Sequence, residues 1–271
     1  MRCLYVDMDG TLLGPGGALV LDADKAFTLL GVRAVEACAR VGAEVVLMSG
    51  RRRVQVAEDA RLLAQTSYIF ELGACVVLDG EEHWLTGDWR PGERTIHEQI
   101  TDTGIPDLLL ERYAGRLEYH APWHHGREVS HLMRGLVDEQ ELNALFAQRG
   151  HPDLRIVDNG VVHRRSPALQ DLPAVHAYHL LPAGASKANA VATHMQARGY
   201  ASHECAAVGD SREDLDVARH VGSFWLVANA VTKDATIRDD IARYGNVRIA
   251  EAAHGPGVYE AVITTLAEAR R

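Results

Sequence analysis

Two aspartates that lie two residues apart near the start of the chain are the strongest chemical signal in the sequence. Asp7 and Asp9 follow the apolar stretch 4–6 and are followed at once by Gly10 and Thr11. If the apolar stretch is a buried strand of an open α/β sheet, both carboxylates lie at the edge where such sheets bind ligands. Carboxylates this close repel each other unless a cation or a shared proton neutralises them, and Mg²⁺ prefers oxygen ligands. We therefore expect one carboxylate to attack an electrophile while the other handles protons.

The same motif also has a purely structural interpretation, because Asp and Gly favour the loops that follow strands. Three further polar segments decide between the two readings, and each follows an apolar stretch or begins a helix. They are Ser49-Gly50-Arg51, Ser186-Lys187 and the acidic segment Gly209-Asp210-Ser211-Arg212-Glu213-Asp214. Each segment alone is compatible with an ordinary turn, a solvated surface or a helix cap. The function rests on their occurring together and in this order.

Strands and helices alternate in the first and last parts of the chain. Strands are expected at 4–6, 43–48, 68–70, 204–208 and 224–227. Helices are expected from Asp22 or Asp24 to about Arg40, and at 52–64, 186–198, 213–220, 232–243 and 258–269. This alternation predicts an α/β fold with a doubly wound, mostly parallel, Rossmann-like core sheet. We place that core at residues 1–80 and 181–271.

The middle of the chain, residues 81–180, has a different character and predicts an inserted α+β domain. From about Cys75 to His179, strands are expected at 75–78, 116–120, 128–133, 154–157 and 161–165, with helices near 93–101 and 139–149. The alternation over 128–134 indicates a strand with one polar face, on which His131 and Arg134 would contact sugar hydroxyls or a second anionic group. A solvated outer face is the alternative. The other polar candidates in this part are Trp123, His124, His125, Arg127, His163, Arg164 and Arg165. The His124–His125 pair lacks a third ligand at a recognisable zinc spacing.

In order and spacing, the four polar segments resemble the signature motifs of the haloacid dehalogenase (HAD) superfamily of phosphatases. The stretch Asp7-Met8-Asp9-Gly10-Thr11-Leu12 is the strongest match, and the resemblance covers residues 1 to about 80 and 180 to 271. The insertion resembles the C2-type cap of the Cof-like, IIB branch, which is similar to caps of sucrose-phosphate and mannosyl-3-phosphoglycerate phosphatases. Glu213 stands where Cof-like relatives usually carry Asn.

The resemblance implies a magnesium site and a covalent mechanism. Mg²⁺ would be held by Asp7, the backbone carbonyl of Asp9, and Asp210, with Asp214 anchoring a metal-bound water or orienting Lys187. Asp7 would attack phosphorus to give an aspartyl-phosphate, and Asp9 would protonate the departing alcohol and later take a proton from water.

The same resemblance implies which groups hold the phosphate. Ser49 and Lys187 would hold the transferring oxygens, and backbone N–H groups around Gly10 and Thr11 would add donors. Gly50 and Arg51 are also assigned to substrate binding, although Arg51 begins a basic run that is equally consistent with a solvated helix start. The insertion would close over the site and choose the leaving group.

Composition excludes several other classes of function. The formal net charge of −9 argues against nucleic acid as a standing partner. No uninterrupted apolar run approaches the ~20 residues needed to cross a bilayer. None of the four cysteines forms a Cys-x-x-Cys pair, which favours buried reduced thiols over disulfides or zinc. We expect a cytoplasmic enzyme without a signal peptide.

The sequence therefore predicts a Mg²⁺-dependent phosphomonoester hydrolase that acts on a small sugar phosphate or a related phosphorylated metabolite. Two alternatives stay open. A phosphosugar mutase would use the same intermediate but pass the phosphoryl group to a sugar. A non-catalytic phosphate-binding regulatory module would keep the pocket without turnover, and the presence of both Asp7 and Asp9 argues against it.

Overall fold

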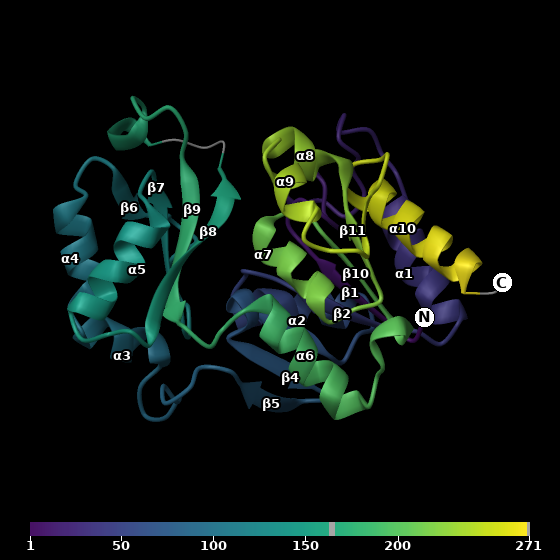
Figure 1. The fold of residues 1–271 in the computed structure, drawn as a ribbon, viewed down its shortest axis with the longest axis horizontal. Helices are drawn as coiled ribbons and strands as arrows, with labels where there is room; N and C mark the ends of the chain where they lie inside the picture. Colours follow the sequence, from purple (N-terminus) through teal and green to yellow (C-terminus); the bar gives the residue numbers. More distant parts are fainter. Residues whose placement is uncertain (163–165, 270–271) are drawn as a thin grey trace. The chain divides into compact units, whose positions relative to one another are not determined.

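The computed structural model describes residues 1–162 and 166–269, which fall into two compact units (Figure 1). The core unit comprises the chain from Met1 to His83 and from Lys187 onward, and the inserted unit runs from Trp84 to Ser186. The candidates His163, Arg164 and Arg165 lie outside the described residues.

The core unit is built around a mostly parallel sheet. Its strands are β1 (Cys3–Asp7), β2 (Glu44–Met48), β3 (Tyr68–Phe70), β4 (Cys75–Leu78), β5 (Glu81–Trp84), β10 (Cys205–Gly209), β11 (Ser223–Leu226) and β12 (Val247–Ile249). Their order in space is β12-β11-β10-β1-β2-β3-β4-β5. The pairs from β12 to β3 are parallel, and β4 is antiparallel to β3. The predicted α/β class with a mostly parallel core sheet is confirmed.

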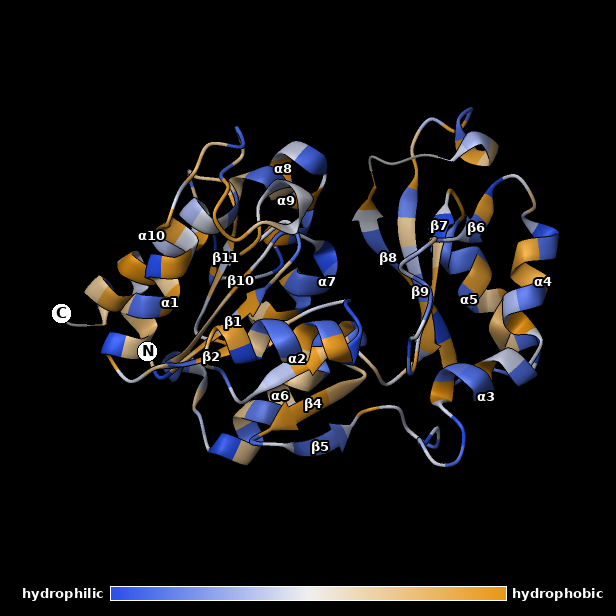
Figure 2. Cartoon of the chain, turned by 180° about the vertical axis from the view of Figure 1, so that it is seen from behind, coloured by the Kyte–Doolittle hydropathy of each residue, from blue (hydrophilic) through white to orange (hydrophobic). Residues whose placement is uncertain are grey.

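Burial explains where each strand lies in this sheet. Every residue of β1 and β10 is buried, as expected for central parallel strands that are covered on both faces. Strand β5, at the edge, carries two exposed glutamates and is blue in Figure 2. Charged residues on an edge strand discourage pairing with other chains.

Helices cover both faces of the core sheet (Figure 1). They are α1 (Leu30–Arg40), α2 (Arg53–Leu62), α6 (Lys187–Arg198), α7 (Arg212–Leu215), α8 (Ala228–Lys233), α9 (Ile237–Ile241) and α10 (His254–Glu268). Short 3₁₀ turns lie at Pro15–Gly17, Glu71–Gly73, Ser202–Glu204 and Asp216–Arg219. Helices α1 and α10 pack against each other on one face, and α6 and α7 pack together on the other.

The predicted start of the first helix is wrong. Helix α1 begins at Leu30, because Asp22 closes a turn instead of capping a helix. Its Oδ1 accepts hydrogen bonds from the N–H groups of Asp24 (3.0 Å) and Ala26 (2.9 Å), which stabilises a turn locally. The predicted helix 213–220 is divided into α7 and a 3₁₀ turn, and 232–243 into α8 and α9.

The inserted unit has the expected α+β composition. Its antiparallel sheet has the order β6-β7-β9-β8, formed by β6 (Leu117–Tyr119), β7 (His131–Gly135), β8 (Leu154–Val161) and β9 (His176–Pro182). Its helices are α3 (Ile96–Asp102), α4 (Ile105–Arg112) and α5 (Glu139–Gln148), with a 3₁₀ turn at Pro167–Leu169. Thr95 and Glu98 form a capping box that begins α3.

Two further expectations can be compared with the structure directly. The four cysteines are buried free thiols, as predicted. Within residues 1–162 and 166–269, none of the helices has both the length and the apolar character needed to cross a membrane.

We predict that Phe146→Ala lowers the free energy of unfolding by about 3–5 kcal/mol, because it opens a cavity in the inserted unit. Phe146 lies on α5, which packs on β8, and its side chain is 0% exposed. Phe27, which is 72% exposed, supplies the matched control. Phe27→Ala should change the free energy by less than about 0.5 kcal/mol in the same urea titration. Equal effects of the two substitutions would show that α5 does not contribute to a cooperative core.

Candidate active site

The carboxyl ends of three neighbouring strands bring together residues that are far apart in the sequence. Strand β1 lies between β2 and β10, with Asp7 beside Met48 and Val6 beside Val208. Ser49 and Asp210 therefore follow the strands on either side of Asp7. This is the sheet edge at which open α/β folds bind ligands.

A buried lysine joins two of the predicted acidic residues. Lys187 Nζ donates hydrogen bonds to Asp7 Oδ1 (2.7 Å) and to Asp214 Oδ1 (2.6 Å). Lys187 is 2% exposed, Asp7 5% and Asp214 0%, so water screens these charges poorly. The first turn of α6, the tip of β1 and helix α7 are thereby tied to one ammonium group.

The pKa shifts of Asp7 and Lys187 indicate that the single charge of Lys187 does not fully compensate the two buried carboxylates. Burial raises the pKa of Asp7 to about 8, and the Asp214 carboxylate adds to the rise against the opposing effect of Lys187. Burial lowers the pKa of Lys187, but the Asp214 and Asp7 carboxylates outweigh it and leave that pKa above its ordinary value. The positive charge near Asp7 is therefore too small to stabilise its anionic form fully.

The acidic cluster fits a hard divalent cation. Carboxylate oxygens of Asp7, Asp210 and Asp214 lie within 4.8 Å of one another. Asp7 Oδ2 is buried and has no hydrogen-bond partner in the described part of the chain. An all-oxygen donor set with an unsatisfied buried carboxylate oxygen suits Mg²⁺.

Asp214 is less available as a direct ligand than the other two aspartates. Its Oδ2 accepts hydrogen bonds from Ser211 Oγ (2.6 Å) and from the N–H groups of Ser211 (3.1 Å) and Asp210 (3.2 Å), while Oδ1 accepts from Lys187. Both oxygens therefore already have donors. The sequence suggested that Asp214 either anchors a metal-bound water or orients Lys187. This geometry favours the second role.

Asp9 lies apart from the buried cluster, in a paired ionic contact. Its carboxylate accepts from Arg51 Nε (2.7 Å) and Nη2 (2.6 Å), and its side chain is 56% exposed. Arg51 Nη1 also donates to Asp59 Oδ2 (2.9 Å). Arg51, predicted to bind substrate, thus bridges the proposed proton donor and a helix α2 carboxylate.

The remaining core candidates lie in the loops that follow β1 and β2. One expectation about them, the phosphate-binding role of two backbone N–H groups, is not met. Ser49 is 1% exposed, and its Oγ accepts from the N–H of Arg51 (3.1 Å), with Gly50 between them. The N–H groups of Gly10 and Thr11 were expected to be donors for phosphate. They instead donate to Leu13 O and Met8 O, both at 3.2 Å, because the loop closes on itself. The Thr11 hydroxyl is buried and has no hydrogen-bond partner among the described residues.

The expectation that His131 and Arg134 share a polar face is wrong. Residues three apart on a strand point to opposite faces. His131 is 0% exposed, stacks on His97 with ring centroids 3.8 Å apart, and donates from Nε2 to His97 O (3.0 Å). Burial lowers the pKa of His131 to about 3. Arg134 forms an ion pair with Glu118 (2.7 Å).

Three residues next to the acidic cluster were not anticipated from the sequence. Lys233 forms an ion pair with Asp210, Asn229 Nδ2 donates to Gly10 O (2.8 Å), and His254 Nδ1 donates to the same oxygen (3.0 Å). Asn229 follows β11 closely, so the rule that strand ends carry the site could have found it. Lys233 is the last residue of the same helix, α8, and His254 begins α10, and neither gave a comparable signal.

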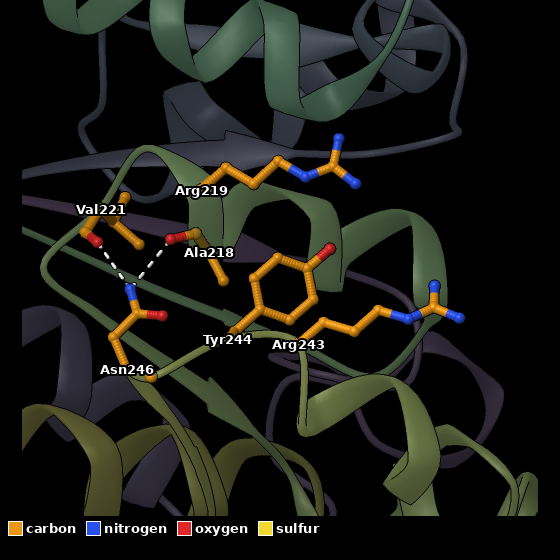
Figure 3. Close-up of a pocket in the computed structure, with 7 residues that line it drawn as sticks. Ala218, Arg219, Val221, Arg243, Tyr244 and Asn246 are labelled. Atoms are coloured by element: carbon orange, nitrogen blue, oxygen red, sulfur yellow. Dashed lines mark hydrogen bonds between the residues drawn. The ribbon is translucent and has the colours of Figure 1, made fainter.

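A shallow surface hollow of about 540 Å³ lies elsewhere on the core unit (Figure 3). It is lined by Ala218, Arg219, Val221, Arg243, Tyr244, Gly245 and Asn246. Asn246 Nδ2 donates to Ala218 O (2.9 Å) and Val221 O (2.7 Å), which fastens the loop before β12. None of the predicted site residues lines this hollow.

Comparison with solved structures identifies the fold. The chain is similar to the sucrose-phosphatase of Synechocystis, with a TM-score of 0.67 at 13% identity over 98% of both chains. It is also similar to a sugar phosphatase of HAD subclass IIB, with a TM-score of 0.59 at 16% identity over 99% of this chain and 98% of the other. The chain has the fold of the haloacid dehalogenase-like hydrolases.

Sequence comparison points to the same group of enzymes. A phosphoglycolate phosphatase of Archaeoglobus fulgidus is 27% identical over 96% of this chain and 95% of its own length. No family model matches the chain. The prediction of a HAD-type phosphatase agrees with both the structural and the sequence relatives.

We predict that Lys187→Met lowers the free energy of unfolding by about 3–5 kcal/mol in EDTA, because it leaves buried carboxylates without their counter-charge. Urea denaturation at neutral pH measures the change. Lys25→Met, at an exposed lysine, is the control and should leave stability within about 0.5 kcal/mol. An undiminished stability of Lys187→Met would contradict the dependence of the cluster on this ammonium group.

Proposed function

We propose that the chain is a Mg²⁺-dependent phosphomonoesterase that works through an aspartyl-phosphate on Asp7. The observation that carries the proposal is the buried Asp7–Lys187–Asp214 arrangement, in which Asp7 Oδ2 has no hydrogen-bond partner among the described residues. A structural ion pair would have its oxygens satisfied. A buried carboxylate held by a lysine on one oxygen and unsatisfied on the other is suited to bind a cation and to attack an electrophile.

The acidic residues around Asp7 would hold the metal. Asp7, Asp210 and the backbone carbonyl of Asp9 are the proposed ligands, and Asp214 supports the group through Lys187 or a metal-bound water. Bound Mg²⁺ would supply positive charge that offsets the repulsion between an anionic phosphate and an anionic nucleophile.

Side chains of the core unit would carry out nucleophilic attack, proton transfer and phosphate binding. Asp7 would form the new O–P bond as the ester O–P bond breaks, and Asp9 would give its proton to the departing alcohol. In the second step water would attack the aspartyl-phosphate, Asp9 would take the proton, and inorganic phosphate would leave. Ser49 and Lys187 would donate to the transferring phosphoryl oxygens.

The relatives narrow the substrates that deserve testing. The curated relative is named for phosphoglycolate, and the structural neighbours include phosphatases of sucrose phosphate and other sugars. We propose a small sugar phosphate or a related phosphometabolite as substrate. The inserted unit is proposed as a C2-type cap domain that selects the leaving group.

Asp7→Asn is predicted to reduce phosphate release by several orders of magnitude while the fold is kept, because an amide is a poor nucleophile. The assay is a phosphate-release screen with phosphoglycolate, sucrose phosphate and hexose phosphates. Asp24→Asn is the control, because Asp24 is exposed and lies between β1 and α1; this variant should retain full turnover. Mass spectrometry of acid-quenched wild type should find the phosphoryl group on the Asp7 peptide. An active Asp7→Asn enzyme would exclude the proposed nucleophile, and conversion of a hexose 1-phosphate without phosphate release would indicate a mutase.

Metal dependence provides a separate prediction. EDTA should abolish phosphate release and added Mg²⁺ should restore it. Asp210→Asn should raise the Mg²⁺ concentration for half-maximal activity at least about tenfold, because it removes a proposed ligand charge. Asp88→Asn, at an exposed loop position, should leave that concentration unchanged. Full activity of the wild type in EDTA would refute the metal requirement.

A further inference from the structure

A second cluster of metal-ligating side chains lies at the opposite end of the core sheet from Asp7. Cys3, Glu44 and Cys205 are the first residues of β1, β2 and β10, and the register pairs Cys3 with both of the others. Paired residues of neighbouring parallel strands point to the same face of the sheet. The three side chains therefore lie on one rung, about 13 Å along β1 from Asp7 at ~3.3 Å per residue.

Helix α6 supplies an imidazole to this rung. Tyr5 lies two residues after Cys3 and points to the same face, and its hydroxyl is 2.8 Å from His194 Nδ1. Ligand atoms of Cys3, Glu44 and His194 all lie within 4.8 Å of one another. Cys3 and His194 are both 0% exposed.

The second imidazole nitrogen of His194 has only a long ionic contact, to Glu44. His194 Nε2 is buried and has no hydrogen-bond partner within the described residues, although Glu44 Oε1 is 3.4 Å away. A fully buried ring nitrogen whose nearest partner is this distant is uncommon in a native protein. Here it faces the carboxylate and the thiol that surround it, so a ligand held by all three groups would satisfy it.

We propose that Cys3, Glu44 and His194 bind a zinc ion, with Cys205 as the fourth ligand. A mixed sulfur, nitrogen and oxygen donor set selects zinc over the hard cations that suit the Asp7 cluster. Ligand atoms of a tetrahedral zinc site lie about 3.3–3.8 Å apart, given bonds of about 2.0–2.3 Å. The separations among the ligand atoms of Cys3, Glu44 and His194 need close by no more than about 1.5 Å. Cys205 lies outside this group of mutually close ligand atoms, so its thiol would have to move toward the ion. Binding would transfer the thiol protons of both cysteines to solvent and leave thiolates as ligands.

Both non-sulfur ligands are already oriented by neighbouring groups. The Tyr5 hydroxyl fixes the His194 ring and directs Nε2 toward the rung. Glu44 Oε1 accepts from Ser67 Oγ (2.7 Å) and Arg198 Nη2 (3.1 Å), and Oε2 accepts from the Tyr200 hydroxyl (3.0 Å). Both Glu44 oxygens therefore already have donors, so a zinc ion would replace one of these contacts. The remaining partners would orient the carboxylate, as they do in protein zinc sites. The Glu44 side chain is 18% exposed, so the ion can reach the rung from the Glu44 side.

This proposal is independent of the phosphatase proposal, and the experiment keeps the two metal sites apart. The full chain is titrated with Co²⁺ in the presence of excess Mg²⁺. The Mg²⁺ occupies the carboxylate site around Asp7 but does not compete for thiolate ligands. We expect one equivalent of Co²⁺ to produce thiolate-to-metal charge-transfer absorption with a tetrahedral visible spectrum, and one equivalent of Zn²⁺ to abolish both. Absence of the charge-transfer band, with no zinc retained after dialysis, would refute the site.

Substitutions then test which residues bind the ion. Cys3→Ser and His194→Gln should each weaken Zn²⁺ binding at least tenfold, and circular dichroism checks that each variant is folded. Cys38→Ser and Cys75→Ser are matched controls, because both cysteines are buried and form no disulfide but lie outside the cluster, and they should keep the spectrum. If Cys38→Ser removed the band while Cys3→Ser kept it, the assignment would be wrong. The wild-type spectrum and stoichiometry decide the question even if a variant fails to fold.

Discussion

The core unit depends on the burial of one ammonium group among more carboxylates than it can neutralise. Burying a charge costs several kcal/mol unless a partner compensates it. Lys187 compensates Asp7 and Asp214, which are 180 and 27 residues away in the sequence. The first strand and the segments that follow the insertion must therefore fold together. The remaining deficit of positive charge at Asp7 is what makes this position suitable for a cation, so the electrostatic strain and the proposed chemistry have the same origin.

Strand β1 and helix α6 relate the two ends of the sheet to each other. Cys3, Tyr5 and Asp7 alternate along β1 and so point to the same face. Lys187 and His194 are seven residues apart on α6, which places both on one side of the helix. Lys187 contacts Asp7 and His194 contacts Tyr5, so α6 lies along β1 with its beginning at the carboxyl end of the strand. One strand–helix contact thus presents an oxygen-rich cluster at one end and a sulfur- and nitrogen-containing cluster at the other.

The sequence predicts best what depends on short-range pattern. Apolar runs that end in Asp7, Ser49 or Asp210 can be placed at strand ends, because parallel strands end at a common edge. Competition between local interactions is harder to anticipate: Asp22 could cap a helix or close a turn, and only the structure shows that it closes a turn. His131 was expected on a polar face that contacts the substrate, yet it is buried and stacks on His97 of α3. Lys233 and His254 reach the site through tertiary packing, which the spacing of residues in the sequence does not reveal.

The pairing of Asp9 with Arg51 sets a condition on the proposed mechanism. Arg51 holds both carboxylate oxygens of Asp9, whereas a proton donor must face the leaving group. Arg51 must therefore release Asp9, or share it, when the substrate arrives. Asp59 makes this exchange feasible, because its contact with Nη1 keeps the guanidinium in place after Asp9 has moved. An anionic substrate group beside Arg51 would replace the lost contact, and binding of substrate would then be coupled to the release of Asp9.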